Sequence, residues 1–307
     1  MLEHLALLNR RHMLRATMAT AVAAGVSGCA RIVPQGIGLA LTPSPLTDAP
    51  VLNFALNLEY LEAEYYLRGV NGTGLTDDLL GPKPADVTGG RQVAFRTPYI
   101  REFMAEIAND ERNHVTFIRR AIKGKLLVEM SRPAIDFTAA FDAVGQLAGL
   151  GAGFDPFADE ESFLLGAFLF EDVGVSAYTG AAKRVSNDMK LADAAGILAV
   201  EAYHAGLIRG QIAEMGPALI DKAHAISKAR DTLDGDIVAE APTIPGRLSI
   251  SNTDENGLAF PREVQQVLNI AYGTPGKNVK RGGFFPHGFN GVVRHSSLDS
   301  NHQQGVA

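Results

Sequence analysis

Four long segments of the chain are rich in apolar residues and are bounded by residues that begin or end helices. Asp48 is a predicted N-cap, Pro98 suits a first helical turn, and Gly69 or Gly72 is a predicted stop. Long helices are therefore predicted over residues 48–69, 98–123, 159–183 and 187–215. A shorter fifth helix is predicted over 217–233, before Asp234 and Gly235. The pattern predicts an all-α protein.

Two long connections separate these helices. Residues 71–97 are rich in Gly and Pro, and a loop of this length is usually functional or a lid. Residues 125–157 form a second long connection, with a short helix predicted over 137–147. We assign residues 48–235 to a helix bundle.

The chain after the bundle, residues 236–307, is predicted to be a largely irregular extension. It has one or two helical turns around 262–271, and its Phe-rich stretch 282–286 is expected to pack back on the bundle. The last dozen residues are expected to be disordered.

The first 28 residues are predicted to be an export signal. Residues 9–15 resemble a twin-arginine motif, and the apolar stretch that follows is too short to span a bilayer. Residues 26–29 look like a bacterial lipobox, in which Cys29 would carry the lipid. The alternative is an ordinary cleavable signal in which Cys29 is incidental. Residues 29–47 are then a linker.

These features predict an extracytoplasmic protein, in the periplasm or cell envelope, whose contact with the membrane is through the lipid anchor alone. No later segment is expected to span a bilayer. Because Cys29 is the only cysteine, no intramolecular disulfide can form. Apolar residues make up 46% of the chain and charged residues 20%, which argues against intrinsic disorder. The net charge of −6 and the lack of a basic cluster argue against nucleic acid as a partner.

Two Glu-x-x-His tetrads, Glu111 to His114 and Glu201 to His204, carry the candidate chemistry. Residues three apart share one face of a helix. Each tetrad follows a helix with a Glu among apolar residues, Glu59 in one case and Glu171 in the other. Charged groups are rarely buried unless they are paired or bind metal. The alternative is that Glu111 and His114 face solvent on a charged helix. Taken together, the order predicts a ferritin-like four-helix bundle with one long crossover.

The six residues would hold two iron or two manganese ions, because carboxylates and imidazoles suit both metals. By two-fold symmetry, Glu111 and Glu201 would bridge the ions. Glu59 and His114 would complete the coordination of one ion, and Glu171 and His204 that of the other. Glu62 is an alternative to Glu59, one turn away, whereas Glu64 points elsewhere.

A weak internal repeat relates the two halves. Tyr66 follows Glu59 by seven residues, and Tyr178 follows Glu171 by seven, so each tyrosine shares a helix face with its glutamate. These tyrosines, and Tyr203, are candidate hydrogen-bond donors or electron-transfer residues; ordinary core tyrosines are the alternative. Asp110 and Asp172 are candidates to hold a ligating imidazole, or else solvated groups.

The chain also resembles a known family, the desiccation-related ferritin-like proteins of bacteria and plants. The similar stretches are residues 52–66, 154–157, 225–235 and 266–286, and the resemblance spans about 50–292. It implies a ferritin-like fold and an association with desiccation or oxidative stress.

A reduced dinuclear site reacts with O₂ or peroxide, so ferroxidase activity, peroxide reduction or manganese catalase-like disproportionation is expected. The alternative is a stress-associated structural or binding protein with a structural or vestigial metal site. We expect a monomer or small homo-oligomer, because an anchor and long extensions would crowd the packing surfaces of an iron-storage shell.

Overall fold

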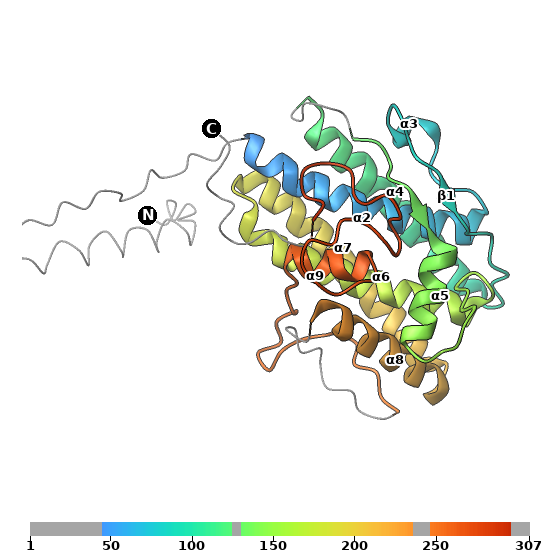
Figure 1. Ribbon diagram of the computed structural model, residues 1–307. Helices are drawn as coiled ribbons and strands as arrows, with labels where there is room; N and C mark the ends of the chain where they lie inside the picture. Colours follow the sequence, from blue (N-terminus) through green and yellow to red (C-terminus); the bar gives the residue numbers. More distant parts are fainter. Residues whose placement is uncertain (1–44, 125–129, 236–245, 296–307) are drawn as a thin grey trace, which may run out of the picture. The chain divides into compact units, whose positions relative to one another are not determined.

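Four long helices lie side by side in the computed structural model of this protein (Figure 1). Helix α2 packs mainly against α4, and α6 mainly against α7, so the bundle consists of two helical hairpins that meet where α2 contacts α6. The bounds of the helices are Pro45–Asn71 for α2, Pro98–Ile122 for α4, Glu160–Ala181 for α6 and Asp188–Glu214 for α7. The prediction of an all-α four-helix bundle is confirmed.

The structure describes residues 45–124, 130–235 and 246–295, all within the unit formed by residues 43–307. The predicted export signal, most of the predicted linker, Cys29 and the last dozen residues lie outside this part of the chain.

Asp48 has a different role from the predicted one. Helix α2 begins at Pro45, so Asp48 lies in its first turn and does not cap it. The buried Asp48 carboxylate instead accepts hydrogen bonds from the backbone N–H groups of Ser186 at 2.9 Å and Asn187 at 3.2 Å. It therefore satisfies backbone donors at the start of α7 and ties the two hairpins together.

Gly69 is not the end of α2, which continues to Asn71 and is followed by Gly72 with φ of 79°. A Cβ on Gly69 would lie 2.2 Å from the ring of Phe163 on α6. Gly69 is needed for close packing between α2 and α6.

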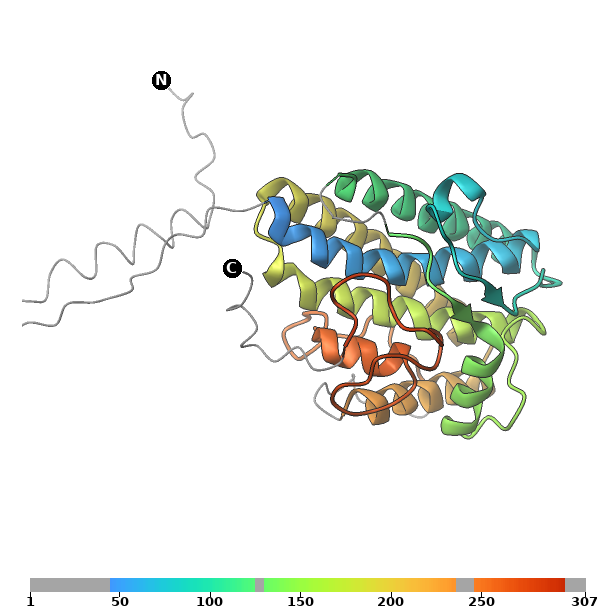
Figure 2. The ribbon, with the colours of Figure 1, turned by 45° about the horizontal axis from the view of Figure 1, so that its top comes forward.

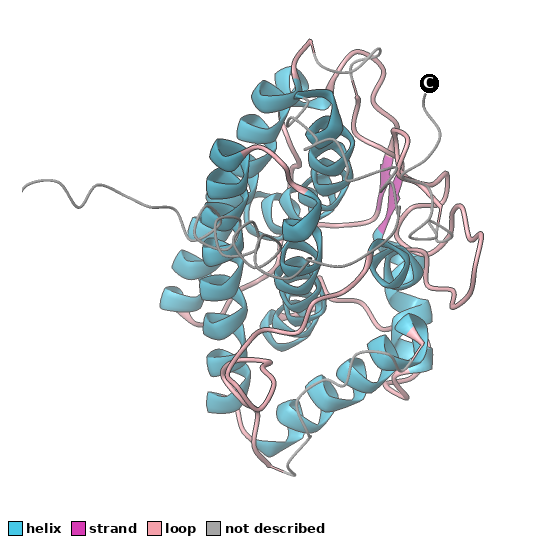
Figure 3. Cartoon of the chain, turned by 90° about the vertical axis from the view of Figure 1, so that its left-hand side faces the viewer, coloured by secondary structure: helices cyan, strands magenta, loops and turns pink. Residues whose placement is uncertain are grey.

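The two long connections pair with each other. The first contains α3 (Asp77–Leu80) and β1 (Val87–Thr88), and the second contains β2 (Ile135–Asp136) followed by α5 (Phe137–Leu147). The two short strands run parallel and lie beside the helices (Figure 3). Their pairing joins the 71–97 loop to the crossover that leads from α4 to α6.

The remaining helices cover α6. Helix α8 (Pro217–Asp234) contacts α6 and α7, and α9 (Val264–Ala271) contacts α6 and α8; the short helix η1 (Ala182–Arg184) follows α6. Figure 2 shows α9 along α6, on the side of the bundle away from α4. Phe284 packs its ring 5.0 Å from those of Phe141 and Phe170. Residues of the C-terminal extension thus form one wall around α6.

Within the described ranges, α7 is the one helix long and apolar enough in composition to cross a bilayer. This contradicts the expectation that no segment after the signal would be long and apolar enough to span a bilayer. A core helix of a bundle can have the same length and composition, and α7 buries Glu201, His204 and Arg209 against the rest of the protein. We therefore describe α7 as a bundle helix.

Candidate metal centre

The four long helices bring the six predicted residues together inside the bundle. Each Glu-x-x-His pair presents both side chains on one face of its helix, as the three-residue spacing requires. The four glutamates are fully buried, and the two histidines are nearly so. The residues are Glu59 on α2, Glu111 and His114 on α4, Glu171 on α6, and Glu201 and His204 on α7.

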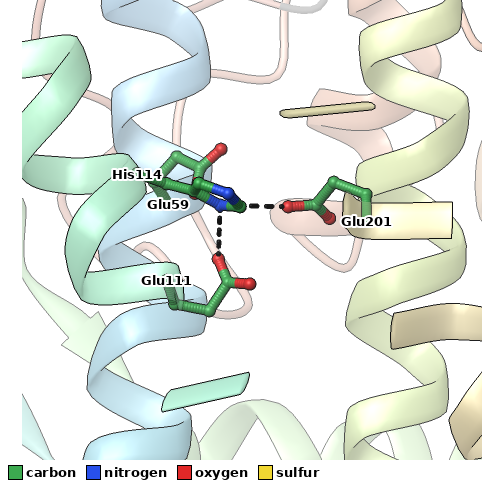
Figure 4. Close-up of side chains that lie close together, drawn as sticks. All are labelled: Glu59, Glu111, His114 and Glu201. Atoms are coloured by element: carbon green, nitrogen blue, oxygen red, sulfur yellow. Dashed lines mark hydrogen bonds and ion pairs between the residues drawn. The ribbon is translucent and has the colours of Figure 1, made fainter. Parts of the chain in front are cut away.

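One group of side chains surrounds His114 (Figure 4). Its Nδ1 atom lies 3.2 Å from Glu59 Oε2, 3.4 Å from Glu111 Oε2 and 3.6 Å from Glu201 Oε1. Three helices contribute to this group, so it depends on the packing of both hairpins.

A second group surrounds His204. Its Nδ1 atom lies 3.1 Å from Glu111 Oε1 and 3.5 Å from Glu171 Oε2. Glu111 therefore directs one oxygen toward each histidine and belongs to both groups. This placement is the one that a carboxylate bridging two metal ions requires. Glu201, the other predicted bridge, has an oxygen in the first group.

The donor atoms suit metal ions. Several buried atoms of the cluster have no hydrogen-bond partner among the described residues: Glu111 Oε1, Glu171 Oε2, both oxygens of Glu201, and His204 Nδ1. Leaving a buried polar group unsatisfied costs about 1–3 kcal/mol. The candidate ligand atoms within each group lie no more than 4.8 Å apart. Four carboxylates also balance the charge of two divalent cations, so the residues fit a pair of iron or manganese ions.

Two tyrosines hold the outer oxygens of the terminal glutamates. The hydroxyl of Tyr66 donates a 2.5 Å hydrogen bond to Glu171 Oε1, and that of Tyr178 donates to Glu59 Oε1. Each tyrosine thus bonds to the glutamate of the opposite hairpin rather than that of its own helix. Both glutamates keep Oε2 toward a histidine.

The three other candidate residues differ in position. Asp110 Oδ2 lies 3.3 Å from His204 Nε2, where a carboxylate can orient the ring. Asp172 is not near a histidine: it forms ion pairs with Arg209 and Arg230, because the residue after Glu171 points about 100° away around the helix. Tyr203 is 75% exposed and lies outside the cluster.

The two halves of the centre are not equivalent. Aligning Glu59 with Glu171 pairs Glu62 with Gly174, and aligning the tetrads pairs Asp110 with Val200. A Cβ on Gly174 would lie 2.2 Å from Glu201 Oε2 and 3.2 Å from Glu62 Oε1. Gly174 therefore makes room for two carboxylates. Sequence reasoning missed it, although the internal repeat contains the signal.

Buried charges shift the pKa values strongly. Burial raises the pKa of Glu59 to about 7, against the opposing effect of His114. Burial would also raise the pKa of Glu111, but the neighbouring imidazoles of His114 and His204 lower it to about 2. Although burial opposes it, the surrounding carboxylates raise the pKa of His114 to about 11 and of His204 to about 12. Burial and neighbouring carboxylates raise the pKa of Glu201 well above its usual range.

These shifts predict that the metal-free protein is most stable near pH 5. Glu59 and the two histidines have pKa values in the folded state above the ordinary 4.5 and 6.5, so their contribution falls as the pH rises from 4.5 toward 12. Glu111 has a lowered pKa, so its contribution is lost as the pH falls from 4.5 toward 2. Thermal unfolding in a chelator at pH 3, 5 and 9 should give the highest midpoint at pH 5. A midpoint that rises steadily from pH 5 to 9 would contradict this assignment of charges.

A helix bundle with two Glu-x-x-His pairs, two further glutamates and one long crossover has the architecture of the ferritin-like class. Comparison with known families supports this: a ferritin-like domain matches residues 47–214, and the chain belongs to this family. The chain is 31% identical to the desiccation-related protein PCC13-62 of Craterostigma plantagineum over 251 residues, which cover 73% of this chain and 77% of that protein. It is 25% identical to the ferritin-like catalase Nec2 of Nesocodon mauritianus over 277 residues, covering 80% and 84%. Among solved structures, none matches the chain.

Proposed function

We propose that this protein binds two iron or manganese ions in the bundle and disproportionates hydrogen peroxide. The proposal depends mainly on the position of Glu111, which directs one carboxylate oxygen toward His114 and the other toward His204. Several of the candidate ligand atoms around it are buried and have no hydrogen-bond partner among the described residues. The similarity to a ferritin-like catalase supports peroxide as the substrate. A monomer or small homo-oligomer suffices, because one chain supplies all six ligands.

The net reaction converts two molecules of hydrogen peroxide into two of water and one of O₂. When bound, a pair of such ions would accept two electrons from one peroxide, which becomes O₂, and pass them to the other, which becomes water. Glu111 and Glu201 would lie between the ions. Glu59 and Glu171 would bind through Oε2, because tyrosine hydroxyls hold Oε1. Asp110 would keep His204 oriented, as carboxylates do for metal-binding imidazoles.

We also propose that the protein lies outside the cytoplasm. The twin-arginine-type signal would export it, and a lipid on Cys29 would tether it in the periplasm or cell envelope. Peroxide removal there would protect the envelope during oxidative stress or drying.

A second function is favoured by the 31% identity to a desiccation-related protein. In that case the bundle would act as a structural or binding protein, and the metal ions would stabilise it without turnover.

Elemental mass spectrometry on the protein purified from its native export route is the first test. We expect two irons or manganeses per chain, and O₂ evolution from hydrogen peroxide that follows the metal content. A folded protein that stays empty when offered Fe(II) and Mn(II) would contradict the metal centre. Full metal loading without any peroxide or O₂ reaction would favour the structural function.

A further inference from the structure

Glu62 is a buried carboxylate that the metal centre does not require. It lies on α2 one turn from Glu59 and is 4% exposed. Within the described part of the chain it makes no hydrogen bond, and its strongest electrostatic neighbour is Glu201. Four other glutamates already balance two divalent cations, so Glu62 has no charge to neutralise in a loaded site.

A small cavity lies beside Glu62. Its volume is about 20 Å³, and apart from Glu62 its walls are apolar or glycine. One water needs about 10–15 Å³, so the cavity can hold one water or a molecule of two oxygen atoms. The lining includes Glu62, Gly174, Phe170, Ile270, Ala271 and Phe284.

The cavity adjoins the metal centre through Gly174. Glu201 Oε2 and Glu62 Oε1 are both close to the place that a Cβ on Gly174 would occupy, so only a glycine leaves that space open. The other half of the bundle has no counterpart, since Gly174 occupies the position that corresponds to Glu62.

The C-terminal extension closes the opposite wall. Ile270 and Ala271 come from α9, and Phe284 from the loop after it, and all three are buried. The extension thus supplies one wall of the cavity. Figure 2 shows α9 on the side of the bundle away from α4.

We infer that this cavity holds hydrogen peroxide next to the metal pair, with its hydrogen bond made to the Glu62 carboxyl group; the inference rests on the proposed function. Hydrogen peroxide both donates and accepts hydrogen bonds, so it pairs with a carboxyl group in either protonation state. Dioxygen has no hydrogen-bond donor, so the Glu62 carboxyl group in the otherwise apolar wall would not favour its binding. Organic hydroperoxides are larger than the cavity.

Variants at two walls test the inference. Glu62→Leu removes the polar group and is expected to raise KM for hydrogen peroxide about tenfold, or about 1.4 kcal/mol, with kcat unchanged. Glu62→Gln, which still hydrogen bonds, should stay near the wild-type KM. Both variants should retain two metal ions per chain. Loss of a metal in Glu62→Leu would make Glu62 a ligand and overturn the inference.

Ala271→Val should fill the cavity, and Ala229→Val, buried on α8 away from it, is the matched control. In crystal structures at high resolution, we expect an ordered water beside Glu62 in the wild type and in Ala229→Val but not in Ala271→Val. Absence of that water from the wild type would overturn the inference whatever the activity. If Glu62→Leu and Ala271→Val both keep the wild-type kcat and KM, the inference about the cavity is wrong and the proposed function stands. If the metal-loaded wild type shows no turnover, the proposed function and the inference are both wrong.

Discussion

Replacing both Glu111 and Glu201 by alanine is expected to leave a folded protein that binds no metal and does not disproportionate peroxide. Glu111 belongs to both ligand groups, and Glu201 supplies an oxygen to the first, so the double variant keeps no complete set of ligands. The fold should survive, because the change removes buried carboxylates that repel each other. Without its redox centre the protein should lose at least about a thousandfold in rate, since enzymes owe at least about a millionfold to their active sites.

The control is Glu106→Ala with Glu214→Ala, which removes two exposed glutamates from the same helices, α4 and α7. It should keep both metal ions and full activity. Elemental analysis, circular dichroism and O₂ evolution distinguish the two double variants. If the Glu111 and Glu201 variant retains two metals per chain, the centre lies elsewhere. If it loses them yet remains fully protective against drying, the structural function is the correct one.

The second large effect is expected from Asp172→Ala, outside the metal centre. The Asp172 carboxylate is 2.8 Å from Arg209 Nε and 2.8 Å from Arg230 Nη2, and all three side chains are buried. Both guanidinium groups also lie over the ring of Phe168, at 4.9 Å and 4.6 Å. Removing the carboxylate breaks the buried ion pairs that Asp172 forms with both arginines, which should cost about 3–5 kcal/mol.

Glu161→Ala is the matched control, on the same helix. The ion pair between Glu161 and Arg96 is exposed to solvent, so its loss should change the stability by no more than about 1 kcal/mol. Denaturant unfolding of the metal-free proteins measures both differences. Equal stability of the two variants would show that Asp172 is not the anion on which the buried arginines depend.

The positions of the helices could be predicted from the sequence because their signals are local. Apolar periodicity, Pro98 and the glycines that follow the helices depend only on neighbouring residues. The predicted helix over 137–147 has the observed bounds, and the five longer predicted helices end within three residues of theirs. The Glu-x-x-His pairs are also local, since a three-residue spacing on a helix places both side chains on one face wherever that helix packs.

Other parts of the centre depend on how separate helices face one another. The partners of Tyr66 and Tyr178 lie on the opposite hairpin, so no spacing within one helix could reveal them. The error at Asp172 has the same cause, because adjacency to Glu171 in sequence means a different direction on a helix. Asp48 accepts a hydrogen bond from the backbone of Ser186, 138 residues away, just before α7.

The sequence by itself therefore determined the helices, their order and the six residues of the candidate centre. Tertiary structure alone decided which oxygen of each carboxylate faces a histidine, and that Glu62 lies beside a cavity opened by Gly174 and covered by the C-terminal extension. The physical reason is that a periodic pattern specifies the buried face of a helix, whereas the contacts of that face depend on the packing of segments far apart in the chain.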